Sequence, residues 1–193
     1  MALSALMICL ICATPTAGSA GVVSGVLLAV IDRLKLTHQQ QLDFLFTAGA
    51  FGLVIANNAS ISGAEGGCQA EVGSASAMAS AALVAASGGT PDQSAQAVAI
   101  TIKNMMGLIC DPVAGLVEVP CVKRNALGSS QAFISADMAL AGIRSVIPPD
   151  EVIHAMYQVG RQMPQIFKET AEGGLAVTPT AQRLSKEILE KQK

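Results

Sequence analysis

Five cysteines have the greatest scope for chemistry in this 193-residue sequence, because a thiolate can bind a metal or act as a nucleophile. They are Cys9, Cys12, Cys68, Cys110 and Cys121. An odd number cannot pair completely as disulfides within one chain, and the N-terminal segment lacks the lysine or arginine that begins a secretory leader. We therefore expect free thiols or metal ligands.

Cys68 follows two glycines and precedes an alanine- and serine-rich stretch, about Gln69–Ala86, that we predict to be a helix. Gly66 and Gly67 permit positive φ angles and a close backbone approach. A thiol at a helix N-terminus lies among free N–H groups at the positive end of the dipole, which favours a thiolate, a cluster sulfur or a substrate carboxylate. A helix C-cap followed by a buried structural cysteine explains the pattern equally well, so both interpretations stay open.

Cys110 and Cys121 flank a loop in which Pro112 lies near the first cysteine and Pro120 directly precedes the second. The proline rings stiffen the loop, which would help to hold two thiolates in fixed positions. The ten intervening residues match neither a zinc-ribbon spacing nor a ferredoxin spacing. The spacing alone therefore favours two core cysteines over a metal site.

Neither the remaining cysteine pair nor the two histidines forms a catalytic pattern. Cys9 and Cys12 are separated by Leu-Ile, whereas a redox or zinc motif has a polar or turn-forming middle, so we expect two buried thiols. His38 stands at an expected helix start and should be exposed, whereas His154 has apolar neighbours and should be packed. The sequence contains no phosphate-binding loop and no dinucleotide-binding glycine motif.

The composition limits the classes of partner. A net charge of −2 provides no basic surface for nucleic acid or for an anionic membrane. With 51% hydrophobic and only 13% charged residues, we expect something outside this chain to cover part of its surface. The uncharged run from Met1 to Ile31 could suggest a signal peptide or a membrane segment, but Pro15 and several glycines and serines interrupt it. We favour a buried helix, a turn and a second buried helix, with a signal peptide as the alternative.

Helix start signals recur along the rest of the chain. Thr37 and Gln40 have the spacing of a capping box. Thr90 and Gln93 have the same spacing, with a proline and an acid between them, and predict the start of a helix that should end before Gly107. Further helices are expected at Gln69–Ala86, Ser129–Arg144, Asp150–Gln162 and from Thr178 onward, with an ordered loop at Val113–Val119. We predict an all-α fold, a compact multi-helix domain over residues 1–193 with small-residue helix packing and functional loops rich in glycine and proline.

Four segments together resemble one protein family. They are ICATPTAGSAG, FLFTAGAFGLVIANNASISGAEGGCQAEVGSASAMA, NMMGLICDPVAGLVEVPCVKRNA and DMALAGI. They are similar to the α chain of bacterial L-serine dehydratase of the iron–sulfur type. The resemblance extends from about Ile11 to the final helix, and the combination of GCQAEVG with CDPVAGLVEVPC is highly specific.

The resemblance implies a [4Fe–4S] cluster held by Cys68, Cys110 and Cys121, with one iron left open as a Lewis acid. It also implies conversion of L-serine to pyruvate and ammonia without pyridoxal phosphate, in cytoplasmic serine catabolism that feeds gluconeogenesis. No cysteine follows Cys121, so the chain resembles the two-chain type, in which a separate β chain is the partner. A homo-oligomer is left open.

Polar residues of the first two loops are candidates to bind the substrate by hydrogen bonds: Thr14, Ser19, Asn57, Asn58 and Ser60. We assign no general base, because family chains extend upstream of Ile11 and that part contributes to their site. The sequence therefore resembles an N-terminally truncated family chain. The alternative function is a non-catalytic helical fragment or scaffold of the same family.

Overall fold

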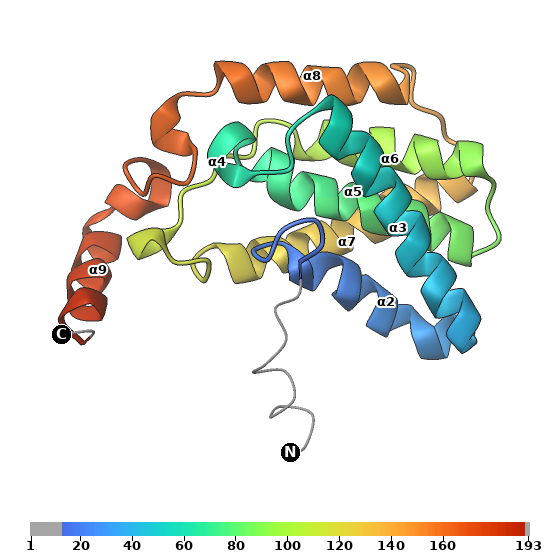
Figure 1. Ribbon diagram of the computed structural model, residues 1–193, viewed down its shortest axis with the longest axis horizontal. Helices are drawn as coiled ribbons and strands as arrows, with labels where there is room; N and C mark the ends of the chain where they lie inside the picture. Colours follow the sequence, from blue (N-terminus) through green and yellow to red (C-terminus); the bar gives the residue numbers. More distant parts are fainter. Residues whose placement is uncertain (1–12, 192–193) are drawn as a thin grey trace.

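The computed structural model describes residues 13–191, and the helices of this part pack around the central helix α5 (Figure 1). The α-helices are α2 (Ala20–Leu34), α3 (His38–Asn58), α4 (Gly63–Gly66), α5 (Cys68–Ala86), α6 (Pro91–Met105), α7 (Cys121–Leu140), α8 (Pro149–Gln162) and α9 (Pro179–Lys191). Short 3-10 turns occupy η1 (Val113–Gly115), η2 (Gln165–Phe167) and η3 (Gly174–Val177). No β-strand occurs within residues 13–191, so the all-α prediction is confirmed.

Helix α5 is central because its side chains are small. Every residue from Cys68 to Val84 is buried, and most of them are alanine, serine or glycine. Small side chains let neighbouring backbones approach closely. Helices α2, α3, α6 and α7 pack around α5, and α8 lies across one side of this bundle (Figure 1). The predicted small-residue packing is therefore confirmed at this helix.

The helix start signals of the sequence are confirmed. Thr37 and Thr90 each accept a hydrogen bond from the backbone N–H three residues later and complete a capping box. Helix α7 differs from its prediction: it begins at Cys121, well before Ser129, and ends at Leu140, before Arg144. Its first turns carry too many polar residues to show an apolar period, and Gly142 ends it with a φ of 84°.

Two expectations at the N-terminal end have different outcomes. The second of the two helices expected before Ile31 is present as α2, whereas the first, with Cys9 and Cys12, falls outside the described residues. Among the helices of residues 13–191, none is both long and apolar enough to cross a membrane.

The prediction for His154 was wrong, because this residue is exposed. Helix α8 buries only one face, which carries Val152, Ile153 and Met156. His154 points away from that face and lies 3.2 Å from the side-chain amide of Gln158. His38 is exposed, as predicted.

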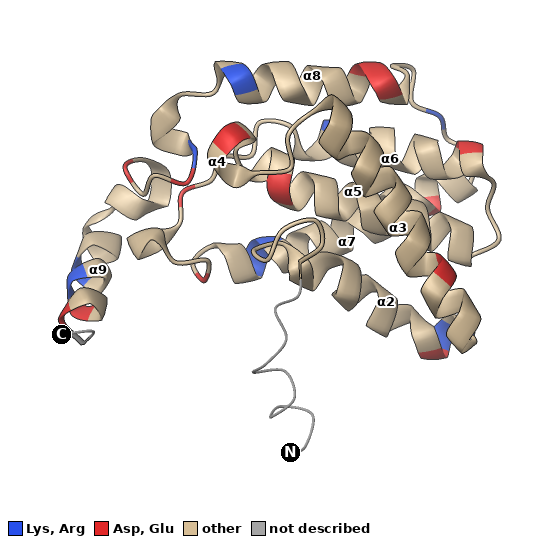
Figure 2. Cartoon of the chain, viewed as in Figure 1, with Lys and Arg blue, Asp and Glu red and all other residues tan. Residues whose placement is uncertain are grey.

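The surface has few charges and many apolar side chains. Figure 2 shows long uncharged stretches on α2, α3 and α7. On these three helices, several large apolar side chains are more than half exposed: Leu28, Phe46, Leu53, Val122 and Ile134. A surface of this kind agrees with the low charge fraction of the sequence, and exposed apolar side chains are typical of surfaces that contact another molecule.

Candidate metal centre

Three buried cysteines come from three separate segments. Cys68 is the first residue of α5, Cys110 lies in the loop after α6, and Cys121 is the first residue of α7. All three thiols are free. The Sγ atoms of Cys68 and Cys110 and a carboxylate oxygen of Glu71 lie within 4.8 Å of one another. Cys121 is not part of this tight group, but the charge on Cys68 is near enough to raise its pKa.

The start of α5 is held in place by backbone geometry. Gly67 has a φ of 75° and joins α4 to α5, which confirms the positive φ expected before Cys68. The N–H of Gln69 donates to the carbonyl of Leu108 at 2.9 Å, and the Gln69 side chain accepts from the N–H of Gly107 at 2.8 Å. These bonds attach the loop that carries Cys110 to the helix that begins with Cys68.

Cys110 is positioned by a second segment of the chain. Its N–H donates to the carbonyl of Phe167 at 2.8 Å, and its carbonyl accepts from the N–H of Glu169 at 2.9 Å. Farther along the same loop, the N–H of Val113 donates to the carbonyl of Val119 at 2.9 Å. The stretch from Cys110 to Cys121 is therefore ordered, as the prolines in the sequence predicted.

Arg124 on α7 faces the thiol of Cys68. Its Nη1 lies 3.6 Å from Cys68 Sγ, 2.8 Å from the carbonyl of Ile109 and 2.8 Å from Oδ1 of Asp111. A hydrogen bond from the Cys110 thiol, and then the positive charge of Arg124, lower the pKa of Cys68. Cys68 is thus the cysteine best prepared to act as a thiolate ligand.

The pKa values of the other two thiols are shifted upward, in the opposite direction to that of Cys68. The hydrogen bond to Cys68 and burial raise the pKa of Cys110. Burial, followed by the charge on Cys68, raises the pKa of Cys121 to about 11. Thiols with raised pKa values keep their protons at neutral pH unless a metal displaces them, so binding to all three cysteines would release protons.

An acidic residue joins the cysteines to the first loop. Glu71 lies one turn after Cys68 on the same face of α5. The hydroxyl of Thr16 donates to Glu71 Oε1 at 2.5 Å, and Thr16 also contacts the hydroxyl of Ser19 at 3.0 Å. Ser19 is fully buried and donates to the carbonyl of Thr14 at 3.3 Å. The predicted residues Thr14 and Ser19 therefore lie in a loop that reaches the cysteine site through Thr16.

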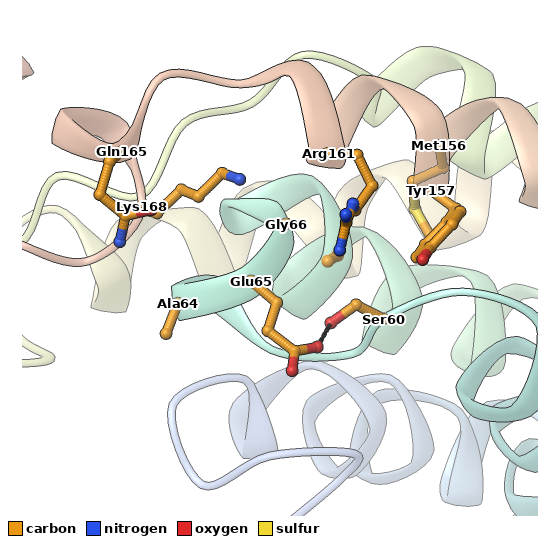
Figure 3. A pocket seen from close by; sticks show the side chains of 11 residues that line it. Ser60, Ala64, Glu65, Gly66, Met156, Tyr157, Arg161, Gln165 and Lys168 are labelled. Atoms are coloured by element: carbon orange, nitrogen blue, oxygen red, sulfur yellow. Dashed lines mark hydrogen bonds between the residues drawn. The ribbon is translucent and has the colours of Figure 1, made fainter.

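The other three predicted substrate-binding residues lie elsewhere. Asn57 and Asn58 are exposed at the end of α3, and the Asn58 amide donates to the carbonyl of Val54 at 2.7 Å. Ser60 donates to Glu65 Oε2 at 2.6 Å. Ser60 lines a cavity of about 370 Å³ between α4 and α8 (Figure 3), and none of the three cysteines lines it. The structure therefore does not gather the five candidates in one place.

Sequence reasoning missed four residues that surround the cysteines: Thr16, Glu71, Arg124 and Glu169. Glu71 had a usable signal, because the spacing of three from Cys68 places both side chains on one helix face. Arg124 and Glu169 had none, since their contacts arise only when α7 and the segment after α8 pack against the site.

The donor set suits an iron–sulfur cluster. Thiolate sulfur is the ligand that such clusters use, whereas calcium and magnesium require oxygen. The backbone of Gly63 lies directly beside the Cys110 thiol, where a larger residue would crowd the ligand. A Cβ at Gly63 would lie only 3.1 Å from Cys110 Sγ and 3.2 Å from Glu71 Oε2. The residues present fit the cofactor that the sequence resemblance implies.

Comparison with known proteins identifies the family of this chain. The model of the serine dehydratase alpha chain family matches residues 3–176. The chain belongs to this family.

A probable L-serine dehydratase alpha chain of Bacillus subtilis is 70% identical over 178 residues, which cover 92% of this chain. The probable L-serine dehydratase alpha chain of Latilactobacillus sakei is 59% identical over 179 residues, or 93% of this chain. The L-serine dehydratase alpha chain of Peptoniphilus asaccharolyticus is 49% identical over 180 residues, again 93%.

The relatives differ in how far they extend beyond the matched part. The match covers 59% of the Bacillus protein, 86% of the Latilactobacillus protein and 62% of the Peptoniphilus protein. The chain therefore spans less than two thirds of two of these three relatives. All three cysteines of the site lie inside the part matched by the family model.

Proposed function

We propose that this chain is the cluster-binding part of an L-serine dehydratase and that Cys68, Cys110 and Cys121 hold a [4Fe–4S] cluster. The observation that carries the proposal is the set of three buried free thiols delivered by three separate segments, two of them within 4.8 Å together with Glu71. The names of the relatives supply the substrate, L-serine. The relatives' names call each of them an alpha chain, which supports a β chain as partner.

The residues of the chain have distinct tasks in this proposal. Arg124 stabilises the thiolate of Cys68 and is itself held by Asp111. Burial of the three cysteines excludes water from their sulfur atoms. The bound cluster supplies an iron without a cysteine ligand, which acts as a Lewis acid toward a hydroxyl group. Loss of water from L-serine followed by hydrolysis of the resulting imine gives pyruvate and ammonia, with no need for pyridoxal phosphate.

The surface and the setting follow from the same proposal. A β chain that covers the exposed apolar side chains of α2, α3 or α7 would remove them from water. The enzyme would then act in the cytoplasm, in serine catabolism.

Anaerobic reconstitution with iron and sulfide tests the cluster. We expect about four irons per chain, the content of one [4Fe–4S] cluster. Replacement of Cys68, Cys110 or Cys121 by alanine should abolish stable loading, whereas Cys12→Ala should not. A wild-type chain that takes up no iron, or equal loading in all four variants, would contradict the proposal.

The activity is tested by pyruvate release from L-serine by the reconstituted chain, alone and together with a β chain. Pyruvate release that depends on the three cysteines supports the proposal. Full iron loading without any turnover under either condition would instead support the alternative, a non-catalytic scaffold of the same family.

A further inference from the structure

Three electron-rich atoms lie close together around Gly63. A Cβ at this position would lie 3.1 Å from Cys110 Sγ, 3.2 Å from Glu71 Oε2 and 3.3 Å from Glu169 Oε2. Gly63 is itself buried, at the start of α4. Two carboxylates from distant parts of the chain therefore lie close together beside a proposed cluster ligand.

This carboxylate pair, Glu71 and Glu169, has no counter-charge. Within residues 13–191, neither side chain forms an ion pair. Arg124 is directed at Cys68 and Asp111 instead. Only 7% of the Glu71 surface is exposed. A carboxylate removed from water to this degree needs a cation or several hydrogen-bond donors.

The second carboxylate oxygen of Glu71 lies next to Gly63. Its Oε1 accepts a hydrogen bond from Thr16, but no described residue donates to its Oε2, the atom that lies next to Gly63. Both carboxylates have an oxygen within 3.3 Å of the position of a Cβ at Gly63, so two negative charges there would repel each other. A cation placed between them would satisfy both.

The backbone at Glu169 fixes the position of its side chain. Glu169 has a φ of 65°, in the left-handed region that residues with a side chain seldom adopt. The bond from its N–H to the carbonyl of Cys110 keeps it there. Backbone strain of this kind persists where the surrounding structure enforces it, and here it places a carboxylate next to the Cys110 thiol.

We propose that Glu71 and Glu169 bind the α-ammonium group of the amino-acid substrate. This inference rests on the proposed function, because it takes the substrate to react at a cluster beside Cys110. In a 2-amino-3-hydroxy acid the ammonium and the hydroxyl stand on adjacent carbons, so a hydroxyl directed at the metal brings the ammonium within a few ångströms of it. An ammonium group supplies a positive charge and three N–H donors, which two carboxylates can share.

The test compares two ligands on the reconstituted chain. L-serine carries the ammonium group, whereas glycerate has a hydroxyl in its place and keeps the carboxylate and the terminal hydroxyl. Binding is followed by the change in the electron paramagnetic resonance and visible absorption of the cluster, so no turnover is needed. The variants are Glu169→Gln and Glu71→Gln. The matched control is Glu65→Gln, because Glu65 lies on α4 close to Gly63 but is bonded to Ser60 and lines the cavity between α4 and α8 (Figure 3).

We expect Glu169→Gln to load iron as the wild type does and to weaken L-serine binding about tenfold or more, the effect of losing a charge-assisted hydrogen bond. Glycerate binding should stay within about twofold or become tighter, because a repelling charge is removed. Glu65→Gln should change the binding affinity of neither ligand. Glu71→Gln should have the same effects as Glu169→Gln. If a glutamine at the buried position 71 prevents folding, the result for Glu169→Gln still tests the inference.

Several outcomes would overturn the inference while leaving the cluster assignment intact. One is a loaded Glu169→Gln chain that binds L-serine as tightly as the wild type. Another is an equal loss of L-serine and glycerate binding, which indicates a general disturbance of the site. A third is a loaded wild-type chain that does not bind L-serine at all. A chain that fails to load iron would instead contradict the proposed function itself.

Discussion

The side chain of Arg124 connects three groups of the site: the Cys68 thiol, the Ile109 carbonyl and the Asp111 carboxylate. Asp111 is only 2% exposed, and its other oxygen accepts from the N–H of Leu175 at 2.7 Å. Removal of Arg124 would leave this carboxylate buried without its cation. We expect Arg124→Ala to lower the free energy of unfolding of the metal-free chain by roughly 3–5 kcal/mol, as measured by urea denaturation.

The control for this variant is Arg183→Ala. Arg183 is 69% exposed and lies 3.9 Å from Glu187 in the next turn of α9, so water screens the interaction and its loss should be close to undetectable. The double variant Arg124→Ala with Asp111→Ala should recover part of the stability, because the orphaned charge is gone as well. Equal stability of Arg124→Ala and Arg183→Ala would show that the buried ion pair contributes nothing.

At the level of single residues, the sequence predicted part of this site. The family resemblance indicated Cys68, Cys110 and Cys121, whereas the spacing of Cys110 and Cys121 alone had favoured two core cysteines. Glu71 could have been found from its spacing of three from Cys68, but Thr16 could not, because nothing in the sequence shows that the first loop folds back onto α5. Contacts between residues 55 positions apart depend on tertiary packing.

At the level of elements, the junction between α4 and α5 decides where Cys68 lies. Gly67 at this junction has a φ of 75°, and a Cβ there would come within 2.9 Å of the carbonyl oxygen of Leu108 and 2.6 Å of Met163 Sδ. We expect Gly67→Ala to lower the free energy of unfolding by roughly 2–4 kcal/mol, from the strained φ and from the clash together. It should also reduce iron uptake, because a shifted backbone moves the Cys68 thiol.

The variant Gly107→Ala separates the effect of a strained φ from the effect of a steric clash. Gly107 also has a positive φ, 90°, but a Cβ there would meet nothing within 4 Å. This variant should lower the stability by only about 1 kcal/mol and leave iron uptake unchanged. If both variants behave alike in denaturation and in iron content, the close approach at Gly67 has no influence on the site.

The same reasoning explains which element boundaries were predictable. Capping boxes at Thr37 and Thr90 are local patterns of four residues, so the starts of α3 and α6 could be read from the sequence. The start of α7 could not, because a contact across the fold helps to hold it: the Asn125 amide donates to the carbonyl of Gly18 at 2.8 Å. Such a helix start lacks a local signal.

At the level of the whole molecule, α5 is the element on which the three cysteine segments meet. The small-residue composition predicted close helix packing, but it did not indicate which helix is central, because several stretches of the chain are rich in alanine and glycine. The central place of α5 follows from the contacts of α2, α3, α6 and α7 with it. Cys68 lies at one end of α5, and the connection to α6 leaves the other end, roughly 27 Å away at 1.5 Å per residue.

This geometry predicts where a bound cluster stabilises the fold. A ligand that binds the folded chain only shifts its stability, and the local effect is largest where the ligand holds separate segments together. We expect iron–sulfide reconstitution to slow amide hydrogen exchange most in residues 108–121 and in the first turns of α5 and α7. Exchange in the connection from Ala86 to Pro91, at the far end of α5, should change little. The measurement is hydrogen–deuterium exchange with mass spectrometry on the metal-free and reconstituted chains.

A Cys68→Ala chain treated in the same way is the control, since it should show no protection after reconstitution. Uniform slowing over the whole wild-type chain, including residues 86–91, would contradict the local model and indicate that the cluster stabilises global folding alone. Protection confined to residues 108–121 would exclude Cys68 from the ligand set, because the start of α5 would then gain nothing from the metal. The pattern of protection therefore tests each of the three segments separately.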